Sequence, residues 1–144
     1  MIRIGNAQFW VHDQDEALAF YTKTLGWELR SDVTMEEWHF RWLVVGPPGQ
    51  DDVGLVLMSI PGPPMLDADS SAQLADLVAK GAGGTLFLET DDCQGTYDEL
   101  STRGVVFNDP PTRQPYGIDT SFRDPSGNNV RVTQVLDYDE RRGG

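Results

Sequence analysis

The sequence predicts an α+β fold in which two tandem β-α-β-β-β modules form a half-open barrel. Strand-like and helix-like segments follow one another in the same order in both halves of the 144-residue chain. Asp13 and Asp91 each precede a helix-like segment, Gly26 and Gly104 each end one, and both pairs are 78 residues apart. A sheet with a helix on one face must bury its other face, so two paired modules would enclose a cleft suited to a small ligand.

The first module begins with a strand followed by a capped helix. Apolar and polar residues alternate over residues 2–11, which predicts a strand. Asp13 is a preferred N-cap residue because its carboxylate can accept a hydrogen bond from the first helical turn. The helix should run to about residue 25 and end at Gly26, which tolerates the left-handed backbone of a helix end.

Three more strands and a second helix complete the first half. Aromatic and β-branched residues predict strands at residues 27–33, 38–45 and 53–60. A turn at residues 46–52 separates the last two strands, and a proline-rich connector covers residues 61–68. A short helix is expected over residues 71–80, where Gly81 stops it.

The second module repeats this order of elements. A strand is predicted at residues 85–90. Asp91 or Asp92 should cap the helix that follows, and Gly104 should end it. Two more strands are expected at residues 105–107 and 116–123, with a proline break between them at 109–111.

A closing hairpin has the clearest local signal in the second half. Asp124-Pro125-Ser126-Gly127 supplies a tight turn, because Asp bonds its own backbone, Pro presets φ and Gly accepts positive φ. Residues 130–133 then alternate apolar and polar, so Arg131 and Thr133 share one face of the last strand.

We expect a single domain over residues 1–144, since a chain of this length can bury a real core. Its parts are module 1 over about 2–60, a linker with a short helix over 61–81, module 2 over about 82–135, and a tail at 136–144. One cysteine, Cys93, excludes an internal disulfide framework and a multi-cysteine zinc site.

The charge of the chain limits its partners. The formal net charge is −12, from 23 acidic against 11 basic residues, which argues against nucleic acid as a partner. An acidic surface favours solubility and could attract a cationic ligand. No segment is apolar enough to span a membrane or to act as a signal peptide, so a cytoplasmic location without membrane attachment is expected.

Four motifs carry a resemblance to a known group of proteins. They are Val11-His12-Asp13, Ala19-Phe20-Tyr21, Leu25-Gly26-Trp27, and the hairpin from Phe122 to Asn128. In this combination they resemble the vicinal oxygen chelate superfamily, which includes glyoxalase I, extradiol dioxygenases, and fosfomycin and bleomycin resistance proteins. The resemblance covers residues 2 to 134 and implies the glyoxalase/bleomycin resistance fold and a homodimer.

The resemblance also implies four metal-ligand positions, and none of them holds a good ligand here. They fall on Asn6, Val56, Thr85 and Arg131. Asn and Thr are feeble ligands for a transition metal, Val is none, and Arg cannot deprotonate. Arginine would also repel a divalent ion, since two unit charges 4 Å apart cost about 4 kcal/mol at an effective dielectric near 20. We therefore expect no metal in the usual place and no other cofactor.

The remaining chemistry-bearing side chains are candidates for a ligand site. Arg131 could anchor a carboxylate, phosphate or enolate oxygen, or it could form an internal salt bridge. His39 and Arg41 are two residues apart on a predicted strand, so both would lie on one face, where His39 could act as a general base or be merely solvated. Tyr116 lies beside the closing hairpin, where its phenol could reach a ligand. Cys93, at a helix start, could have a lowered pKa, although an inert thiol is the safer interpretation.

Polar and aromatic side chains complete this set. Asn6, Gln8 and Thr85 could bond a ligand or satisfy one another and Arg131. The aromatic candidates for a stacking wall are Trp10, Trp38, Trp42, Phe87 and Tyr116. The full set of ligand-binding candidates is Asn6, Gln8, Trp10, His39, Arg41, Val56, Met58, Thr85, Phe87, Tyr116 and Arg131.

Three functions fit these residues. The first is metal-independent binding of a small organic molecule, a drug or metabolite, with resistance by sequestration as its concrete form. The second is a metal-independent enzyme of the isomerase, lyase or hydrolase type, with His39 or Tyr116 as acid or base and Arg131 holding an oxyanion. The third is an enzyme whose metal site has moved to His39 and acids such as Glu36, Glu37 or Glu89.

Overall fold

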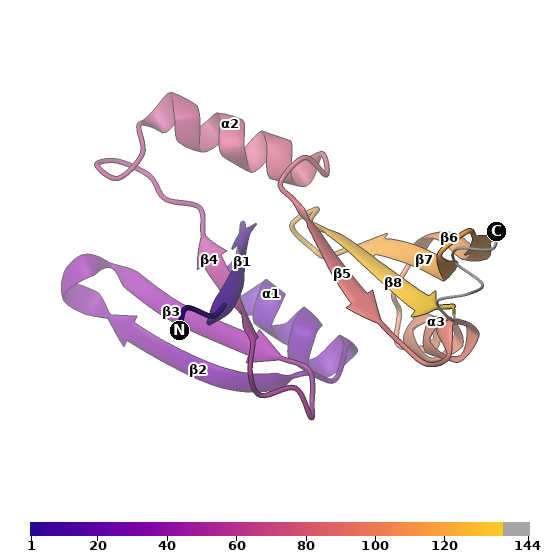
Figure 1. The fold of residues 1–144 in the computed structure, drawn as a ribbon. Coiled ribbons are helices and arrows are strands. Elements are labelled where there is room, and N and C mark those ends of the chain that lie inside the picture. Colours follow the sequence, from indigo (N-terminus) through magenta and orange to yellow (C-terminus); the bar gives the residue numbers. More distant parts are fainter. Residues whose placement is uncertain (137–144) are drawn as a thin grey trace. The chain divides into compact units, whose positions relative to one another are not determined.

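A computed structural model describes residues 1–136 and contains two four-stranded mixed sheets with a few helices. Figure 1 shows the strands of each sheet side by side. The chain divides into two compact units. Unit 1 comprises Met1–Gly84 with Pro125–Asn128, and unit 2 comprises Thr85–Asp124 with the described residues from Asn129 onwards. All but the first residue of the expected tail, 136–144, lies outside the described residues.

Unit 1 holds the first sheet, in the strand order β1-β4-β3-β2. Its strands are β1 (Asn6–Val11), β2 (Glu28–Met35), β3 (Phe40–Gly46) and β4 (Gly54–Ser59). Its helices are α1 (Gln14–Ala19), the π-helical η1 (Phe20–Thr24), the 3-10 helix η2 (Glu36–Trp38) and α2 (Ala68–Ala79). Strand β1 runs parallel to β4, and the other neighbours are antiparallel.

Unit 2 holds the second sheet, in the equivalent order β5-β8-β7-β6. Its elements are β5 (Thr85–Glu89), α3 (Cys93–Thr102), β6 (Phe107–Gln114), β7 (Gly117–Arg123) and β8 (Asn129–Val135). Strand β5 is parallel to β8, and the other neighbours are antiparallel. The repeated β-α-β-β-β order and the α+β class are therefore confirmed.

The helices begin and end where local chemistry requires. The side chain of Asp13 accepts a hydrogen bond from the amide of Glu16, so it caps α1 as predicted. In unit 2 the cap is Asp92, which accepts from the amide of Gly95 at 2.9 Å. The segment from the cap Asp13 to Gly26 is therefore one residue longer than the segment from the cap Asp92 to Gly104. The wider π-helical turn of η1 accommodates the extra residue.

Each sheet has its own core against its helix. In unit 1 the buried Tyr21 contacts Trp27 at a ring distance of 5.3 Å, and β3 and β4 also carry buried apolar side chains. In unit 2 the ring of Phe107 contacts Tyr97 of α3 at 4.7 Å and the buried Phe122 at 5.3 Å. Among the described residues, none of the helices has both the length and the apolar character needed to cross a membrane.

The tip of the closing hairpin packs within unit 1. Ser126 accepts a hydrogen bond from the amide of His12, and the side-chain amide of Asn128 donates to the carbonyl of Trp10. Gly127 has φ of 108°, and a Cβ atom there would lie 2.3 Å from the carbonyl oxygen of Val78. Only glycine fits this position, because both the backbone angle and the close approach exclude a side chain.

Several predicted boundaries differ from the structure. The first strand begins at Asn6 rather than at residue 2. Residues 36–38 form a 3-10 helix, so the third strand begins at Phe40 rather than at Trp38. The helix expected over residues 71–80 begins at Ala68. Of the two caps predicted for the second module, Asp91 and Asp92, the structure uses Asp92. Strand β6 passes through the expected break at 109–111, because its register with β7 shifts between Asp109 and Thr112, and an edge strand tolerates proline at such an irregularity.

Candidate functional site

Each sheet has one face that packs against its own helix and one that does not. In unit 1, Arg41 forms a salt bridge with Asp15 of α1, which places the odd-numbered residues of β3 on the α1 side. In unit 2, the ring contacts of Tyr97 place Phe107 and Phe122 on the α3 side. We call the other two surfaces the face opposite α1 and the face opposite α3.

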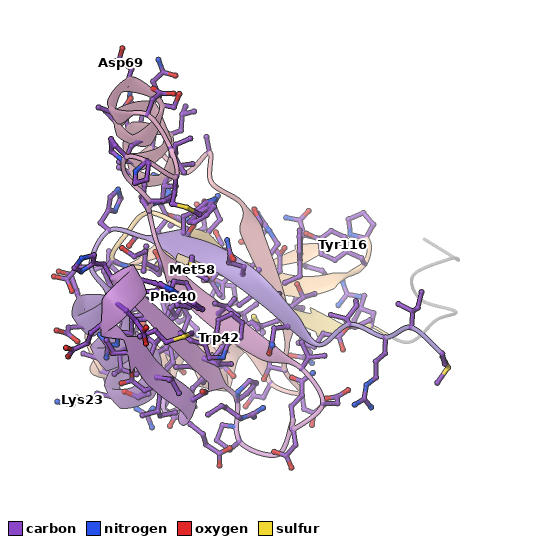
Figure 2. All side chains as sticks on the ribbon, turned by 90° about the vertical axis from the view of Figure 1, so that its left-hand side faces the viewer. Lys23, Phe40, Trp42, Met58, Asp69 and Tyr116 are labelled. Atoms are coloured by element: carbon purple, nitrogen blue, oxygen red, sulfur yellow. The ribbon has the colours of Figure 1, made fainter. Side chains whose placement is uncertain are left out.

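The face opposite α1 is apolar and uncharged over most of its area. Strand register groups three sets of side chains on it: those of β1 and β4, Asn6, Gln8, Trp10, Val56 and Met58; those of β3, Phe40, Trp42 and Val44; and those of β2, Ser31, Val33 and Met35. Figure 2 labels Phe40, Trp42 and Met58, which come from the paired strands β3 and β4. Aromatic rings and thioethers favour contact with flat apolar molecules.

One end of the face opposite α1 is charged. Arg30 lies against Gly46, and a Cβ atom at that glycine would be 2.6 Å from the guanidinium carbon. Arg30 is 3.7 Å from Glu28 and donates to the carbonyl of Pro47 at 2.7 Å. This end of the face is therefore occupied by the protein's own polar contacts, and the apolar part lies further along the strands.

Asn6 sits at the start of β1 and depends on a glycine opposite it. Gly54 is its register partner on β4. A Cβ atom at Gly54 would lie 2.8 Å from the Oδ1 atom of Asn6 and 2.6 Å from Cγ1 of Val44. The absence of a side chain at this position lets the Asn6 carboxamide lie close to the sheet, where it can bond a ligand.

The face opposite α3 carries a charged cluster of Tyr116, Asp119 and Arg131. The Nη1 atom of Arg131 donates to Oδ2 of Asp119 at 2.5 Å, and the phenol of Tyr116 donates to the same oxygen at 2.5 Å. The Asp119 side chain is 4% exposed, whereas that of Arg131 is 40% exposed. A buried carboxylate thus holds two partly exposed donors, and Arg131 has the internal salt bridge that was one of its two predicted roles.

The hydrogen bonds of this cluster shift two titrations. The bond to Asp119 raises the pKa of the Tyr116 phenol, and burial raises it further, while Arg131 acts in the opposite direction. The bond to Asp119 also raises the pKa of Arg131. Both groups therefore keep their protons at neutral pH, so Tyr116 acts as a hydrogen-bond donor and is poorly suited to act as a base.

Two predicted residues of β5 border this cluster. Phe87 is the register partner of Arg131 and is 73% exposed. Thr85 begins the strand, is exposed, and pairs with Asn129. Phe87 therefore supplies an aromatic surface next to the guanidinium of Arg131.

His39 and Arg41 do not lie where the strand pattern predicted. His39 follows the 3-10 helix with φ of 50°, in the left-handed region, and is exposed outside the sheet. Arg41 lies on the α1 side, where it bonds Asp32 at 2.9 Å and Asp15 at 2.7 Å. The prediction that the two share a face rested on a strand beginning at Trp38, and it is wrong because that strand begins at Phe40.

Asp119 was not predicted as a site residue, although the hairpin held a signal for it. With the turn at residues 124–127, antiparallel pairing puts Ser121 opposite Arg131 and Asp119 one pair further along the same face. Met35 and Phe40 were also missed, since their face depends on the bulge in β2 and on the start of β3.

The predicted metal positions are divided between the two faces. Asn6 and Val56 lie on the face opposite α1, and Thr85 and Arg131 lie on the face opposite α3. Within residues 1–136, no group of three or more His, Cys, Asp or Glu side chains is arranged to hold a metal ion.

Unit 2 also contains a buried cysteine and a surface depression. The thiol of Cys93 is buried, which raises its pKa, and it donates to the carbonyl of Val132 at 3.8 Å. This favours the inert thiol over the reactive one. A shallow depression of about 310 Å³ is lined by Glu89, Thr90, Asp91, Gln134 and Val135. It has no aromatic lining and two acidic residues.

The chain is similar to known proteins along nearly its whole length. Residues 3–132 match the model of the Glyoxalase/Bleomycin resistance protein/Dioxygenase superfamily. An uncharacterized protein of Shewanella frigidimarina (strain NCIMB 400) is 36% identical over 129 residues, which is 88% of this chain and 89% of that protein. The crystal structure of UcmS2 is 39% identical, with a TM-score of 0.83 and coverage of 92% of this chain and 98% of that one. TnmS3, an antibiotic binding protein from Streptomyces sp. CB03234, is 32% identical, with a TM-score of 0.73 and coverage of 94% and 98%.

Proposed function

Because the chain belongs to the Glyoxalase/Bleomycin resistance protein/Dioxygenase superfamily, we propose that it binds and sequesters a small organic molecule, a drug or a metabolite, without a metal. The observation that carries this proposal is the uncharged aromatic and thioether surface of the face opposite α1. Trp10, Trp42 and Met58 lie on this face. The only hydrogen-bond donors on these three side chains are the indole N–H groups of the two tryptophans. Such a surface favours the binding of flat apolar molecules.

The similarity to an antibiotic-binding protein supports this proposal. TnmS3 is described as binding an antibiotic and shares 32% of its residues with this chain over nearly the full length. The ligand-binding residues that we propose are Asn6, Gln8, Trp10 and Met58 on the first sheet, and Thr85, Phe87, Tyr116 and Arg131 on the second. Val56 lies on the same face of the first sheet but is only 4% exposed, so it is left out. His39 and Arg41 are left out of this set because of where they lie.

Two observations favour binding over acid–base catalysis. The pKa of Tyr116 is raised by its bond to Asp119, so its phenol does not ionise readily. His39, the other predicted acid or base, lies outside the sheet. A catalytic base must sit within hydrogen-bond reach of the proton that it removes, and neither residue offers a basic atom on either face.

The proposal includes a homodimer and a cytoplasmic location. Met1, Ile2 and Ile4 are exposed in the segment before β1, which is an edge strand of its sheet, and an exposed apolar segment beside a strand edge suits pairing with a second copy. The mass of the purified protein in light scattering tests this part, and a monomer at micromolar concentration would contradict it.

A ligand screen with matched tryptophan variants tests the function. A thermal-shift screen over cationic antibiotics and aromatic acids, with and without divalent metals, should identify a ligand that stabilises the protein equally in both conditions. Trp42→Ala should then weaken that ligand at least about tenfold, since a buried aromatic contact contributes about 1.5 kcal/mol or more. Trp38→Ala is the control, because Trp38 is 70% exposed and lies outside the sheet.

Three results would contradict the proposal. The first is an equal loss of affinity in the two tryptophan variants. The second is a stoichiometric metal in the purified protein that ligand binding requires. The third is turnover of the ligand with a pH-dependent rate, where the activity is lost in His39→Ala. That result would favour the metal-independent enzyme with His39 as acid or base.

A further inference from the structure

The salt bridge of Arg131 has an arrangement that an anion anchor would not need. Asp119 is buried, and both Arg131 and Tyr116 donate to a single oxygen of its carboxylate at 2.5 Å. The positive charge on the face opposite α3 is therefore matched by a fixed negative charge that belongs to the protein. A residue meant to attract a carboxylate from solution would work better without such a partner.

A ligand carboxylate at this position would meet opposing forces. It would be attracted by the guanidinium of Arg131 and repelled by the carboxylate of Asp119, which lies within hydrogen-bond distance of the same guanidinium. The two terms largely cancel, while the ligand would still lose its hydration on binding. The cluster thus gives little net affinity for an anion.

An uncharged ligand with a carbonyl group fits the cluster better. Asp119 takes up the Nη1 atom of Arg131, while the side chain is 40% exposed, so other N–H groups of the guanidinium can donate to a carbonyl oxygen. The phenol of Tyr116 also donates to Asp119, so it adds a polar group without a charge to this surface. The exposed ring of Phe87 lies on the neighbouring strand as a register partner of Arg131 and can stack on an aromatic ring.

We propose that Asp119 sets the charge specificity of the face opposite α3, and that the ligand class is an uncharged aromatic compound with a carbonyl acceptor rather than an aromatic acid. This inference rests on the proposed binding function and names the ligand class for it. Asp119 is buried, so it acts by holding Arg131 and Tyr116 and does not itself touch the ligand.

An isosteric pair of probes tests the specificity. Anthracene-9-carboxamide and anthracene-9-carboxylate differ in charge and hardly in shape, and their dissociation constants can be measured by fluorescence titration. The wild-type protein should bind the amide at least about tenfold more tightly. Asp119→Asn, which keeps the shape of the side chain and removes its charge, should strengthen carboxylate binding about tenfold and abolish the preference.

Two further variants separate charge from structure. In the double variant Asp119→Asn with Arg131→Gln, carboxylate binding should return to the weak wild-type level, because the unpaired cation has gone. In Arg131→Gln alone, the carboxylate of Asp119 remains, so the preference for the amide should widen at least about threefold. A purely structural role of Asp119 would weaken both probes alike in every variant, and the ratio of the two constants would not change.

The outcomes distinguish this inference from the proposed function. If the wild-type protein binds the carboxylate as tightly as the amide, or if the ratio is the same in Asp119→Asn, the inference is wrong and the binding function stands. If the wild-type protein binds neither probe at millimolar concentration, the result counts against the binding function and against the inference with it. If Asp119→Asn does not fold, the ratio in Arg131→Gln decides the question alone.

Discussion

In the first sheet, Val56 pairs with Gln8 at the third position of both strands, and in the second sheet Arg131 pairs with Phe87 at the same place. The two sheets have the same strand order and the same pattern of parallel and antiparallel neighbours. Equivalent backbone positions therefore carry an aliphatic side chain in one sheet and a guanidinium in the other.

The neighbouring strands differ in the same way. Ser121 pairs with Arg131, and Val44 pairs with Val56. Ser121 and Val44 therefore occupy equivalent positions in the two sheets. Two residues earlier on each strand stand Asp119 and Trp42. The second sheet thus has an acid where the first has a large aromatic residue, and this acid is what allows Arg131 to lie on that face.

The comparison shows that the repeated unit determines where a side chain lies and leaves its chemistry open. Backbone pairing and the helix on the opposite face satisfy the fold in both sheets. An apolar face gains from contact with an apolar ligand, and a charged face needs a matched partner before it can be stable. The two faces therefore suit different chemical groups: the face opposite α1 suits flat apolar groups, and the face opposite α3 suits polar uncharged groups.

The largest effect is expected when a charge is placed on the apolar face. Val56→Arg reproduces in the first sheet the residue that the second sheet has, but without an acid to pair with it. Because Val56 is 4% exposed, an unpaired guanidinium there should lower the free energy of unfolding by at least about 3 kcal/mol. Urea denaturation followed by circular dichroism measures this change.

A neutral side chain of similar length separates charge from size at the same position. Val56→Met also overfills the site and should cost about 1 to 3 kcal/mol, less than the arginine variant. Equal losses in the two variants would mean that the face tolerates charge, and the contrast between the sheets would then have no energetic basis.

A smaller effect is expected at the cap of the second helix. Asp92→Ala removes the side chain that accepts from the amide of Gly95, so it should cost about 1 kcal/mol of stability. Asp91→Ala is the matched control, since Asp91 is exposed and does not cap α3, and its effect should stay within about 0.5 kcal/mol. Thermal unfolding of both variants decides the assignment, and a larger loss in the Asp91 variant would reverse it.

Much of the fold could be predicted because its signals are local. The cap at Asp13, the glycines at positions 26 and 104, and the turn before Gly127 all lie where short-range chemistry places them. The repeated order of elements follows from these boundaries. The choice between Asp91 and Asp92 stayed open because both can cap, and only the position of the first helical turn decides between them.

The site could be predicted only in part, since it depends on which face of a strand meets the helix. Alternation shows that Arg41 and Trp42 point in opposite directions, but it does not show which of them faces α1. The left-handed residue His39 also moves the start of β3, which short-range patterns did not reveal. To predict the pairing of Arg131 with Asp119, one needs both the hairpin register and the distance between the two side chains. That distance is a tertiary property, which the sequence does not give.

The smallest expected effect concerns the salt bridge on the α1 side of the first sheet. The hydrogen bond from Arg41 lowers the pKa of Asp32 below its usual value of 3.8, although partial burial opposes the shift. A carboxylate with a lowered pKa in the folded state contributes stability above pH 4, and that contribution is lost as the pH falls through the lowered value. Because the Asp32 side chain is 30% exposed, the contribution should be below about 1 kcal/mol. Melting temperatures of the wild-type protein and Asp32→Asn should therefore differ slightly at pH 6 and converge as the pH falls below the lowered pKa. A difference that persists when Asp32 is protonated would show that Asp32 acts through its shape and not its charge.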